Sequence, residues 1–328
     1  MNKPIASLSL DLDNLWSYQR TPGDPGWEER RSYFPALMPP LLDLLDGMAC
    51  RITFFVVGAD AANPENGPWL RMITARGHEV GNHSFEHECW LHRYSREQID
   101  TEIGRAEDAI IAATGERPLG FRGPGFSWSP VLLEVLAQRG YRYDASTLPT
   151  YLAPLARAYF MATSRLSAEQ RRQRRDLFGS FRDGMRPVGA YRWRLPAGRE
   201  LLEIPVTTVP FVKTPFHMSY LIYLSRFSRK LMRAYLRTAL ELCRWTGVNP
   251  SFLLHPLDVL DAGHAPELRF FPGMDVPADA KRALVQDVIA MLAEHFTLVP
   301  MSSHAAQAVA HERLAVLEPR TRRLETVG

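Results

Sequence analysis

Two short clusters of carboxylates and imidazoles near the N-terminus contain the residue types of a catalytic metal centre. Asp11 and Asp13 alternate at the end of an apolar run that begins at Ile5, so both side chains are expected on one face of a strand. His83 and His87 have the i, i+4 spacing that brings two imidazoles together on a helical turn. One carboxylate and two imidazoles leave open positions on a zinc-like ion for water and substrate, and the second carboxylate is free to act as a base. The pattern indicates a hydrolase.

Each cluster on its own also has an explanation without a metal. An Asp-x-Asp at a strand end is often a turn or a helix cap, and a histidine pair at this spacing is more often solvated or hydrogen-bonded than ligating. Two later segments favour the metal centre. Residues 121–125 read Phe-Arg-Gly-Pro-Gly after a helical stretch, and residues 252–255 form an apolar strand that ends in a histidine. A histidine at the end of a buried strand is expected at the sheet edge where α/β proteins build their sites.

Taken in order, these motifs resemble those of the polysaccharide deacetylases, also called carbohydrate esterase family four or the nodulation-deacetylase homology domain. The resemblance extends over about residues 5–302 and depends on short motifs that are specific only as a set. The form Asp11-Leu12-Asp13 is similar to the branch that includes peptidoglycan deacetylase-like proteins and the deformylase of lipid-linked aminoarabinose. The resemblance implies a distorted barrel of roughly seven strands and a divalent metal, for which the nitrogen and oxygen ligands favour Zn²⁺.

The resemblance also implies a role for each residue around the ion. Asp13, His83 and His87 would be the metal ligands. Asp11 would be the general base, and the arginine of the Arg-Gly-Pro-Gly segment, Arg122, would hold the carboxylate of that base. The surface arginine that commonly starts a helix is the alternative for Arg122.

The remaining site residues would act on the leaving group and the substrate. By the same resemblance, His255 would donate a proton to the leaving amine, and Asp144 in Tyr-Arg-Tyr-Asp-Ala-Ser would orient that histidine. Gly125 stands where the family has a tyrosine, so its backbone N–H would stabilise the oxyanion while Phe126 or Trp128 replaces the lost wall of the substrate groove. A turn residue at Asp144 and a hydrogen-bonded core histidine at His255 are the alternatives.

Composition fits one sizeable enzyme domain. The chain has 328 residues, of which 46% are hydrophobic and 23% charged, and a formal charge of +3 gives no reason to expect nucleic-acid binding. Its three cysteines lack the spacing of a disulfide framework or a cysteine metal site. The N-terminus lacks the pattern of a signal peptide, and no apolar run approaches a membrane span. A cytoplasmic location is expected, with peripheral contact at the inner face of a membrane left open.

Strand and helix signals alternate along the chain, which predicts an α/β fold: a distorted parallel (β/α)7-type barrel with functional residues at strand ends. The predicted single domain is 1–310 with an elaborated insertion at about 150–248, followed by a charged C-terminal tail at 311–328. Strands are expected at 5–12, 50–57, 78–81, 119–122, 202–206, 251–254 and 297–301. Helices are expected at 33–47, 68–76, 95–114, 129–140 and 277–296, the third with Ser95 as N-cap and Gly115 as its end.

The predicted insertion contains two segments that pair apolar and basic residues. The first, 151–175, includes the cluster Arg171, Arg172, Arg174 and Arg175. The second, 210–245, has apolar residues at helical spacing and a basic face; these are Phe227, Leu231, Tyr235, Thr238, Leu242 and Trp245, and Arg226, Lys230, Arg233, Arg237 and Arg244. This pattern is typical of an interfacial helix and equally of a barrel helix with a solvated basic side. The arginine cluster suits a lid or a membrane-contacting loop.

These observations predict a metal-dependent amidohydrolase that removes an acetyl or formyl group from an amino sugar, on a cytoplasmic or lipid-linked glycan intermediate. Hydrolysis of a small cyclic or linear amide of the ureide type is the alternative within enzymes. A catalytically silent carbohydrate- or lipid-binding module is the alternative in another class. The retained set of acids and histidines argues against silence, whereas the acyl group, the sugar, the metal and the oligomeric state stay open.

Overall fold

The computed structural model of the chain describes residues 3–163, 166–173, 179, 181–311 and 313–319. In this part of the chain, ten strands form one sheet. The strands are β1 (Ile5–Leu12), β2 (Thr53–Val56), β3 (Glu79–Asn82), β4 (Gly120–Phe121), β5 (Tyr143–Asp144), β6 (Tyr191–Arg194), β7 (Glu200–Glu203), β8 (Ser251–Leu254), β9 (Thr297–Val299) and β10 (Val316–Leu317).

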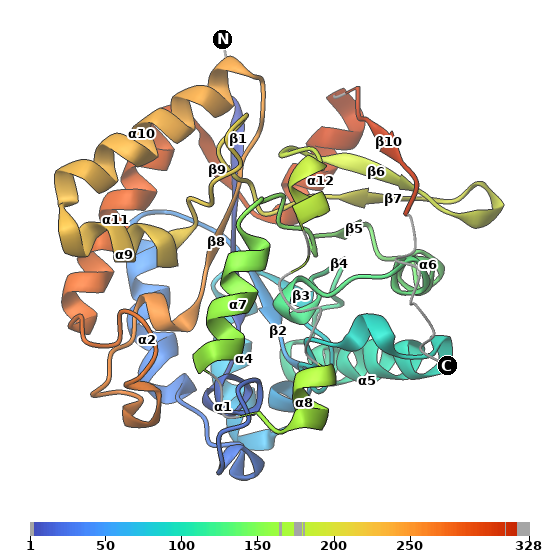
Figure 1. The fold of residues 1–328 in the computed structure, drawn as a ribbon, viewed down its shortest axis with the longest axis horizontal. Helices are drawn as coiled ribbons and strands as arrows, with labels where there is room; N and C mark the ends of the chain where they lie inside the picture. The colour runs from blue at the N-terminus through green and yellow to red at the C-terminus, as the bar shows by residue number, and fades with distance from the viewer. Residues whose placement is uncertain (1–2, 164–165, 174–178, 180, 312, 320–328) are drawn as a thin grey trace.

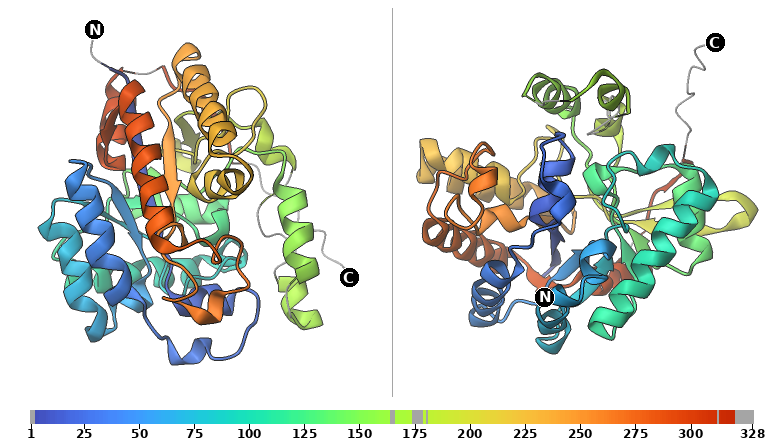
Figure 2. Two further views of the ribbon diagram at one scale, coloured as in Figure 1. Left: turned by 90° about the vertical axis from the view of Figure 1, so that its left-hand side faces the viewer. Right: turned by 90° about the horizontal axis from the view of Figure 1, so that it is seen from below.

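Helices surround the sheet. They are α1 (Leu15–Arg20), α2 (Phe34–Gly47), α3 (Gly58–Ala61), α4 (Gly67–Ala75), α5 (Arg96–Thr114), α6 (Pro130–Gln138), α7 (Ala153–Thr163), α8 (Ala168–Gln173), α9 (Met218–Phe227), α10 (Arg229–Trp245), α11 (Ala278–His295) and α12 (Met301–His311). Figure 1 shows α2, α10 and α11 grouped at one side of the strands and α5 with α6 at the other. Figure 2 shows α7 and α8 as a separate column at the edge of the molecule.

The strand order is β10-β6-β7-β5-β4-β3-β2-β1-β8, with β9 paired to the start of β1. Every pairing is parallel except that of β6 with β7, so the predicted α/β class with a mostly parallel sheet is confirmed and the antiparallel hairpin is a departure. The ladder does not close. Residues 204–207 instead bridge its two sides: the Val206 N–H donates to the Thr147 carbonyl (2.9 Å) and the Thr207 N–H to the Ser251 carbonyl (3.0 Å). The result is a distorted barrel.

Local sequence accounts for the elements that carry the site. Every residue of β1 is buried, as expected for a parallel strand covered on both faces. Helix α5 begins with the predicted N-cap, Ser95, which forms a capping box with Gln98, and ends at Gly115 with φ +78°. These two elements were predicted nearly to the residue because their signals are local.

Helix α10 packs against the core through a face that differs from the predicted apolar stripe. Its buried residues are Met232, Leu236, Ala239, Leu240 and Cys243. Phe227, just before the helix, and Leu231 and Trp245 within it remain exposed, between 55% and 77%. The packing explanation therefore holds for the helix, although an apolar strip next to it stays on the surface.

Two predicted boundaries differ from the structure. The region 150–248 is not wholly peripheral, because it contributes β6 and β7 to the main sheet and α9 and α10 to the core. The charged tail at 311–328 contains β10, which pairs with β6; residues 312 and 320–328, with their arginines, lie outside the described residues. Among the described residues, no helix is long and apolar enough to cross a membrane.

Candidate active site

The predicted metal ligands meet at the C-terminal end of β1. Nε2 of His87 is 2.8 Å and Nε2 of His83 is 3.3 Å from Oδ1 of Asp13. One ligand atom from each of the three residues lies within 4.8 Å of the others, and all three side chains are buried. Burial raises the pKa of Asp13, but His87 and His83 outweigh this effect and hold the pKa well below its usual value. This donor set and its spacing fit one divalent ion.

The two histidines are brought together by a loop rather than by the expected helical turn. The loop follows β3, and Ser84 (φ +60°) and His87 (φ +52°) both adopt left-handed backbone conformations that a helix excludes. Oδ1 of Asn82 accepts the Ser84 N–H at 2.8 Å. Oε2 of Glu102, on α5, accepts the next two backbone N–H groups at 3.0 Å each. The i, i+4 spacing therefore predicted two histidines that do lie together, but in a loop and not on a helical turn.

A backbone carbonyl fixes the ring of His83. Nδ1 of His83 lies 2.6 Å from the carbonyl oxygen of Arg122. Because a carbonyl can only accept, Nδ1 carries the proton and Nε2 is left as the atom that faces Asp13. Arg122 thus orients a candidate ligand through its backbone.

The side chain of Arg122 holds Asp11, as the resemblance implied. Nη1 donates to Oδ1 of Asp11 at 2.6 Å and to the hydroxyl of Ser9 at 2.9 Å. Nε donates to the Ala145 carbonyl at 3.0 Å, and the guanidinium lies 4.3 Å from the ring centre of Phe55. The arginine is fully buried and Asp11 is 5% exposed. This contact leaves Oδ2 of Asp11 facing the candidate proton donor.

His255 follows β8 and lies across the site from the three ligands. Its Nε2 is 4.0 Å from Oδ2 of Asp11. Its Nδ1 is 3.5 Å from the hydroxyl of Ser219 and 4.0 Å from Oδ2 of Asp258. The backbone N–H of His255 donates to the same Asp258 oxygen at 2.7 Å.

Asp144 is not the carboxylate beside His255. It is fully buried at the end of β5, where Oδ1 accepts the Ser146 hydroxyl and its register partner on β7 is Glu203. Burial and the adjacent Glu203 carboxyl raise the pKa of Asp144 well above its usual value and so favour its neutral form. The predicted orienting role therefore has no contact to support it, and Asp258 occupies that place.

The segment after Arg122 explains the glycine at the position of the family's tyrosine. Gly125 has φ +58°, and a Cβ there would lie 3.1 Å from Cβ and Sγ of Cys89. Phe126 and Trp128 are both half-buried. Trp128 stacks on Trp193 with ring centres 5.1 Å apart, so most of this indole packs in the core and offers less of a groove wall than expected.

Sequence reasoning missed Ser219, Asp258 and His217. The acid three residues after His255, beyond a proline, has the spacing of a capping box and could have been noticed. His217 precedes α9, is 8% exposed, and its ring centre is 6.1 Å from that of His255. Burial lowers the pKa of His217 to about 3. Neither Ser219 nor His217 had a local sequence signal, because the start of α9 reaches the site only through the tertiary fold.

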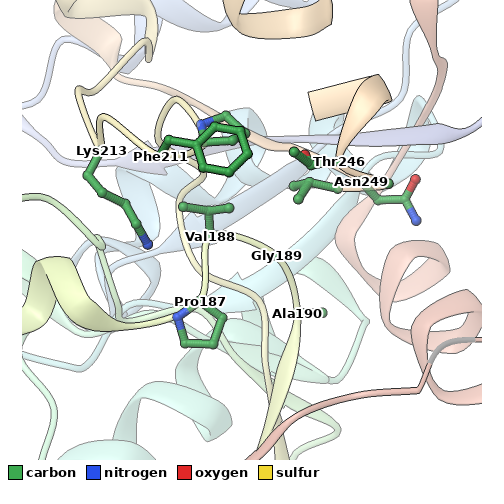
Figure 3. Close-up of a pocket in the computed structure, with 11 residues that line it drawn as sticks. Pro187, Val188, Gly189, Ala190, Phe211, Lys213, Thr246 and Asn249 are labelled. Carbon is green, nitrogen blue, oxygen red and sulfur yellow. The ribbon is translucent and has the colours of Figure 1, made fainter. Parts of the chain in front are cut away.

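One surface pocket lies next to this centre in the sequence, and another contains none of its residues. A pocket of about 440 Å³ begins one residue after His87 and extends to α8; it is lined by Glu88, Trp90, Arg93, Tyr94, Glu169 and Arg172. A second pocket, of about 460 Å³, contains none of the predicted site residues. Figure 3 shows Phe211 and Val188 in its middle, between Lys213 and Asn249. The first is the better placed for a substrate.

Comparison with known proteins agrees with the motifs. Residues 24–143 match the model of the polysaccharide deacetylase family. This segment of the chain is therefore similar to the polysaccharide deacetylase family. The matched residues include His83, His87 and Arg122 but stop before Asp144 and His255, and they begin after both aspartates of β1.

Curated deacetylases are similar to part of the chain. A chitooligosaccharide deacetylase of Bradyrhizobium sp. is 34% identical over 108 residues, which are 32% of this chain and 48% of the relative. A chitin deacetylase of Colletotrichum lindemuthianum is 32% identical over 115 residues (34% and 46%). A peptidoglycan deacetylase of Helicobacter pylori is 29% identical over 85 residues (26% and 29%). The chain thus spans less than half the length of each of these relatives.

The fold extends beyond the matched residues. A crystal structure of a candidate polysaccharide deacetylase from Mycobacterium smegmatis aligns with 99% of this chain and 100% of its own, with a TM-score of 0.57 and 18% identity. This likeness covers β1 and β8, which carry the aspartates and His255, and it concerns the fold alone.

Proposed function

We propose that this chain is a metal-dependent hydrolase that removes an N-acyl group from an amino sugar. The observation that carries the proposal is the convergence of three elements: the ligand set of Asp13 with two histidines, the buried Asp11–Arg122 pair, and His255 with Nε2 4.0 Å from Asp11. The three named relatives, all deacetylases, support an acetyl group in particular.

Asp13, His83 and His87 would hold the ion. A divalent ion bound there would polarise an acyl carbonyl and acidify water, which is what hydrolysis of an unactivated amide requires. Zn²⁺ suits a site of two imidazoles and one carboxylate.

The chain's own residues supply the proton transfers. Asp11 would accept a proton from the attacking water through Oδ2, the oxygen that Arg122 leaves free. His255 would deliver a proton to the nitrogen of the leaving amine from Nε2, which faces the same space. The backbone N–H of Gly125 would stabilise negative charge on the acyl oxygen.

The substrate class is a finer part of the proposal. An N-acetylated glucosamine glycan agrees with the names of the relatives, while a formylated or lipid-linked sugar follows from the Asp-x-Asp form of the first motif. A lipid-linked substrate is supported by exposed apolar residues that begin close to the site on α9, namely Tyr220, Tyr223 and Phe227, and by the neighbouring Arg229 and Lys230. A cytoplasmic chain with peripheral contact at a membrane would suit such a substrate.

The test is product analysis by mass spectrometry with N-acetyl and N-formyl amino sugars, short and lipid-linked, using zinc-loaded protein. Asp11→Asn should keep about one metal per chain and lose roughly 10²–10⁴-fold in turnover. His87→Ala, as the matched comparison, should lose metal and turnover together. Retention of stoichiometric metal by His87→Ala would overturn the ligand assignment.

Wild-type protein that releases no acyl group from any of these sugars would overturn the hydrolase proposal. Turnover of ureide-type amides alone would replace the substrate class and keep the chemistry.

A further inference from the structure

Two side chains, Ser219 and Asp258, converge on the side of His255 that faces away from Asp11. The Ser219 hydroxyl, on the first turn of α9, lies 3.5 Å from Nδ1 of His255 and donates to Oδ1 of Asp258 at 2.9 Å. Oδ2 of Asp258 accepts the backbone N–H of His255 at 2.7 Å. Asp258 is 2% exposed. Its two carboxylate oxygens join the end of β8 to the start of α9, because one accepts from His255 and the other from Ser219.

We propose that Ser219 and Asp258 position His255 as the proton donor, in place of the acid predicted at Asp144. The inference rests on the proposed function and names two further residues for that reaction. Nδ1–H of His255 would donate to the Ser219 oxygen, whose own hydrogen is already directed at Asp258. That arrangement fixes one ring nitrogen and leaves Nε2 directed toward Asp11 and the substrate.

Electrostatics around the ring agree with this arrangement. Burial raises the pKa of Asp258 overall, and His255, its backbone N–H and Ser219 offset part of that effect by favouring the carboxylate. Nζ of Lys281, on α11, donates to the Leu257 and Leu260 carbonyls at 2.8 and 2.6 Å, and so holds the turn that carries Asp258. A carboxylate about 4 Å from an imidazole stabilises the imidazolium that must form before proton donation.

The charged and titratable groups around His255 come from several elements. Asp11 faces Nε2 from β1, and Asp258 faces Nδ1 from the turn after β8. His217 precedes α9 and disfavours a second positive charge beside it. Lys281 lies behind Asp258. Among the described residues, Asp258 is the carboxylate that lies on the Nδ1 side, so its removal should change the titration of His255 in a defined direction.

The direct experiment is NMR titration of the His255 ring in the full chain, assigned by the signal that His255→Ala loses. Asp258→Asn should lower the His255 pKa by about one unit, the low end of the effect of an opposite charge at this range. Ser219→Ala should lower it less, and Ser219→Thr should restore the wild-type value. Asp144→Asn is the matched control, a buried acid elsewhere in the site region, and should keep the wild-type pKa of His255.

Turnover of an N-acetylated chitooligosaccharide provides the second measurement. Asp258→Asn should lower kcat at least tenfold with KM within about twofold, and the pH limb of kcat assigned to His255 should move with its NMR pKa. If Asp258→Asn fails to fold, judged by circular dichroism, Ser219→Ala gives the decision.

The titration tests the positioning of His255, and the turnover tests the proposed function, so each proposal can be contradicted independently of the other. An unchanged His255 pKa in both Asp258→Asn and Ser219→Ala, or a shift in Asp144→Asn, would overturn the inference even if the wild type is active. Shifts as expected in a protein without amidase activity would overturn the proposed function and keep the positioning.

Discussion

Arg122→Met should destabilise the folded chain chiefly by leaving the Asp11 carboxylate buried without its cation. The guanidinium is fully buried, and its Nη1 is 2.6 Å from a carboxylate that is 5% exposed. Removing one partner of such a pair costs about 3–5 kcal/mol. The lost bonds to Ser9 and Ala145 act in the same direction, while the methionine refills part of the volume. The expected loss of unfolding free energy is therefore about 3–5 kcal/mol.

A double-mutant cycle separates the charge from the packing. Asp11→Asn with Arg122→Met removes both charges, so its loss should be smaller than the sum of the single losses by about 1–3 kcal/mol. Arg76→Met is the matched control, because Arg76 pairs with Asp43 and Asp46 while 27% of its side chain is exposed. That surface variant should lose much less unfolding free energy than Arg122→Met, because solvent screens its ion pairs.

Urea unfolding followed by circular dichroism measures all four variants, with a chelator present so that bound metal does not contribute. Additive single losses would refute the reasoning, because they would mean that Arg122 stabilises the fold through its other contacts and not through Asp11. A loss of unfolding free energy in Arg122→Met as small as that in Arg76→Met would also refute the reasoning.

Two further substitutions test the environment of the site. Burial raises the pKa of Asp60 to about 7 from 3.8, so the stability that its protonated form contributes is full below about pH 4 and is lost as the pH rises through 7. In urea unfolding measured at pH values from 4 to 8, Asp60→Asn should abolish this decrease in unfolding free energy, which is at most about 1.4 kcal/mol per pH unit. A pH dependence equal to that of the wild type would contradict the prediction. Gly125→Ala should cost about 1–2 kcal/mol in the same assay because of its left-handed backbone and the adjacent Cys89, and a neutral result would mean that the loop relaxes.

The local signals of the sequence predicted the class of fold and most of the elements in the first half. Strand β1, helix α5 with its caps, and strand β8 lie where periodicity and capping residues placed them, because those features depend on neighbours in the chain. Helix α12 and strand β6 were missed, whereas the strand expected at 202–206 overlaps β7. Helix α12 begins directly after a proline inside a segment that was expected to continue a strand.

The candidate site was predicted in its residue types better than in its contacts. Asp13, His83 and His87 do converge, but through a loop with positive φ angles that Glu102 holds from a distant helix. Asp144 was assigned by the order of motifs, and order says nothing about which buried acid lies next to a given ring. Asp258 stands three residues after His255 in a capping box, a local signal that the order of the motifs does not contain.

The buried acids Asp144 and Glu203 make the protonation of a side chain important for the sheet itself. These two acids face each other across β5 and β7, next to the bridging segment that completes the distorted barrel. Burial and the Glu203 carboxyl raise the pKa of Asp144, so folding favours the uptake of a proton from solvent at this place in the sheet. A rise in pH that removes this proton should therefore weaken the pairing of β5 with β7, at a distance from the candidate site.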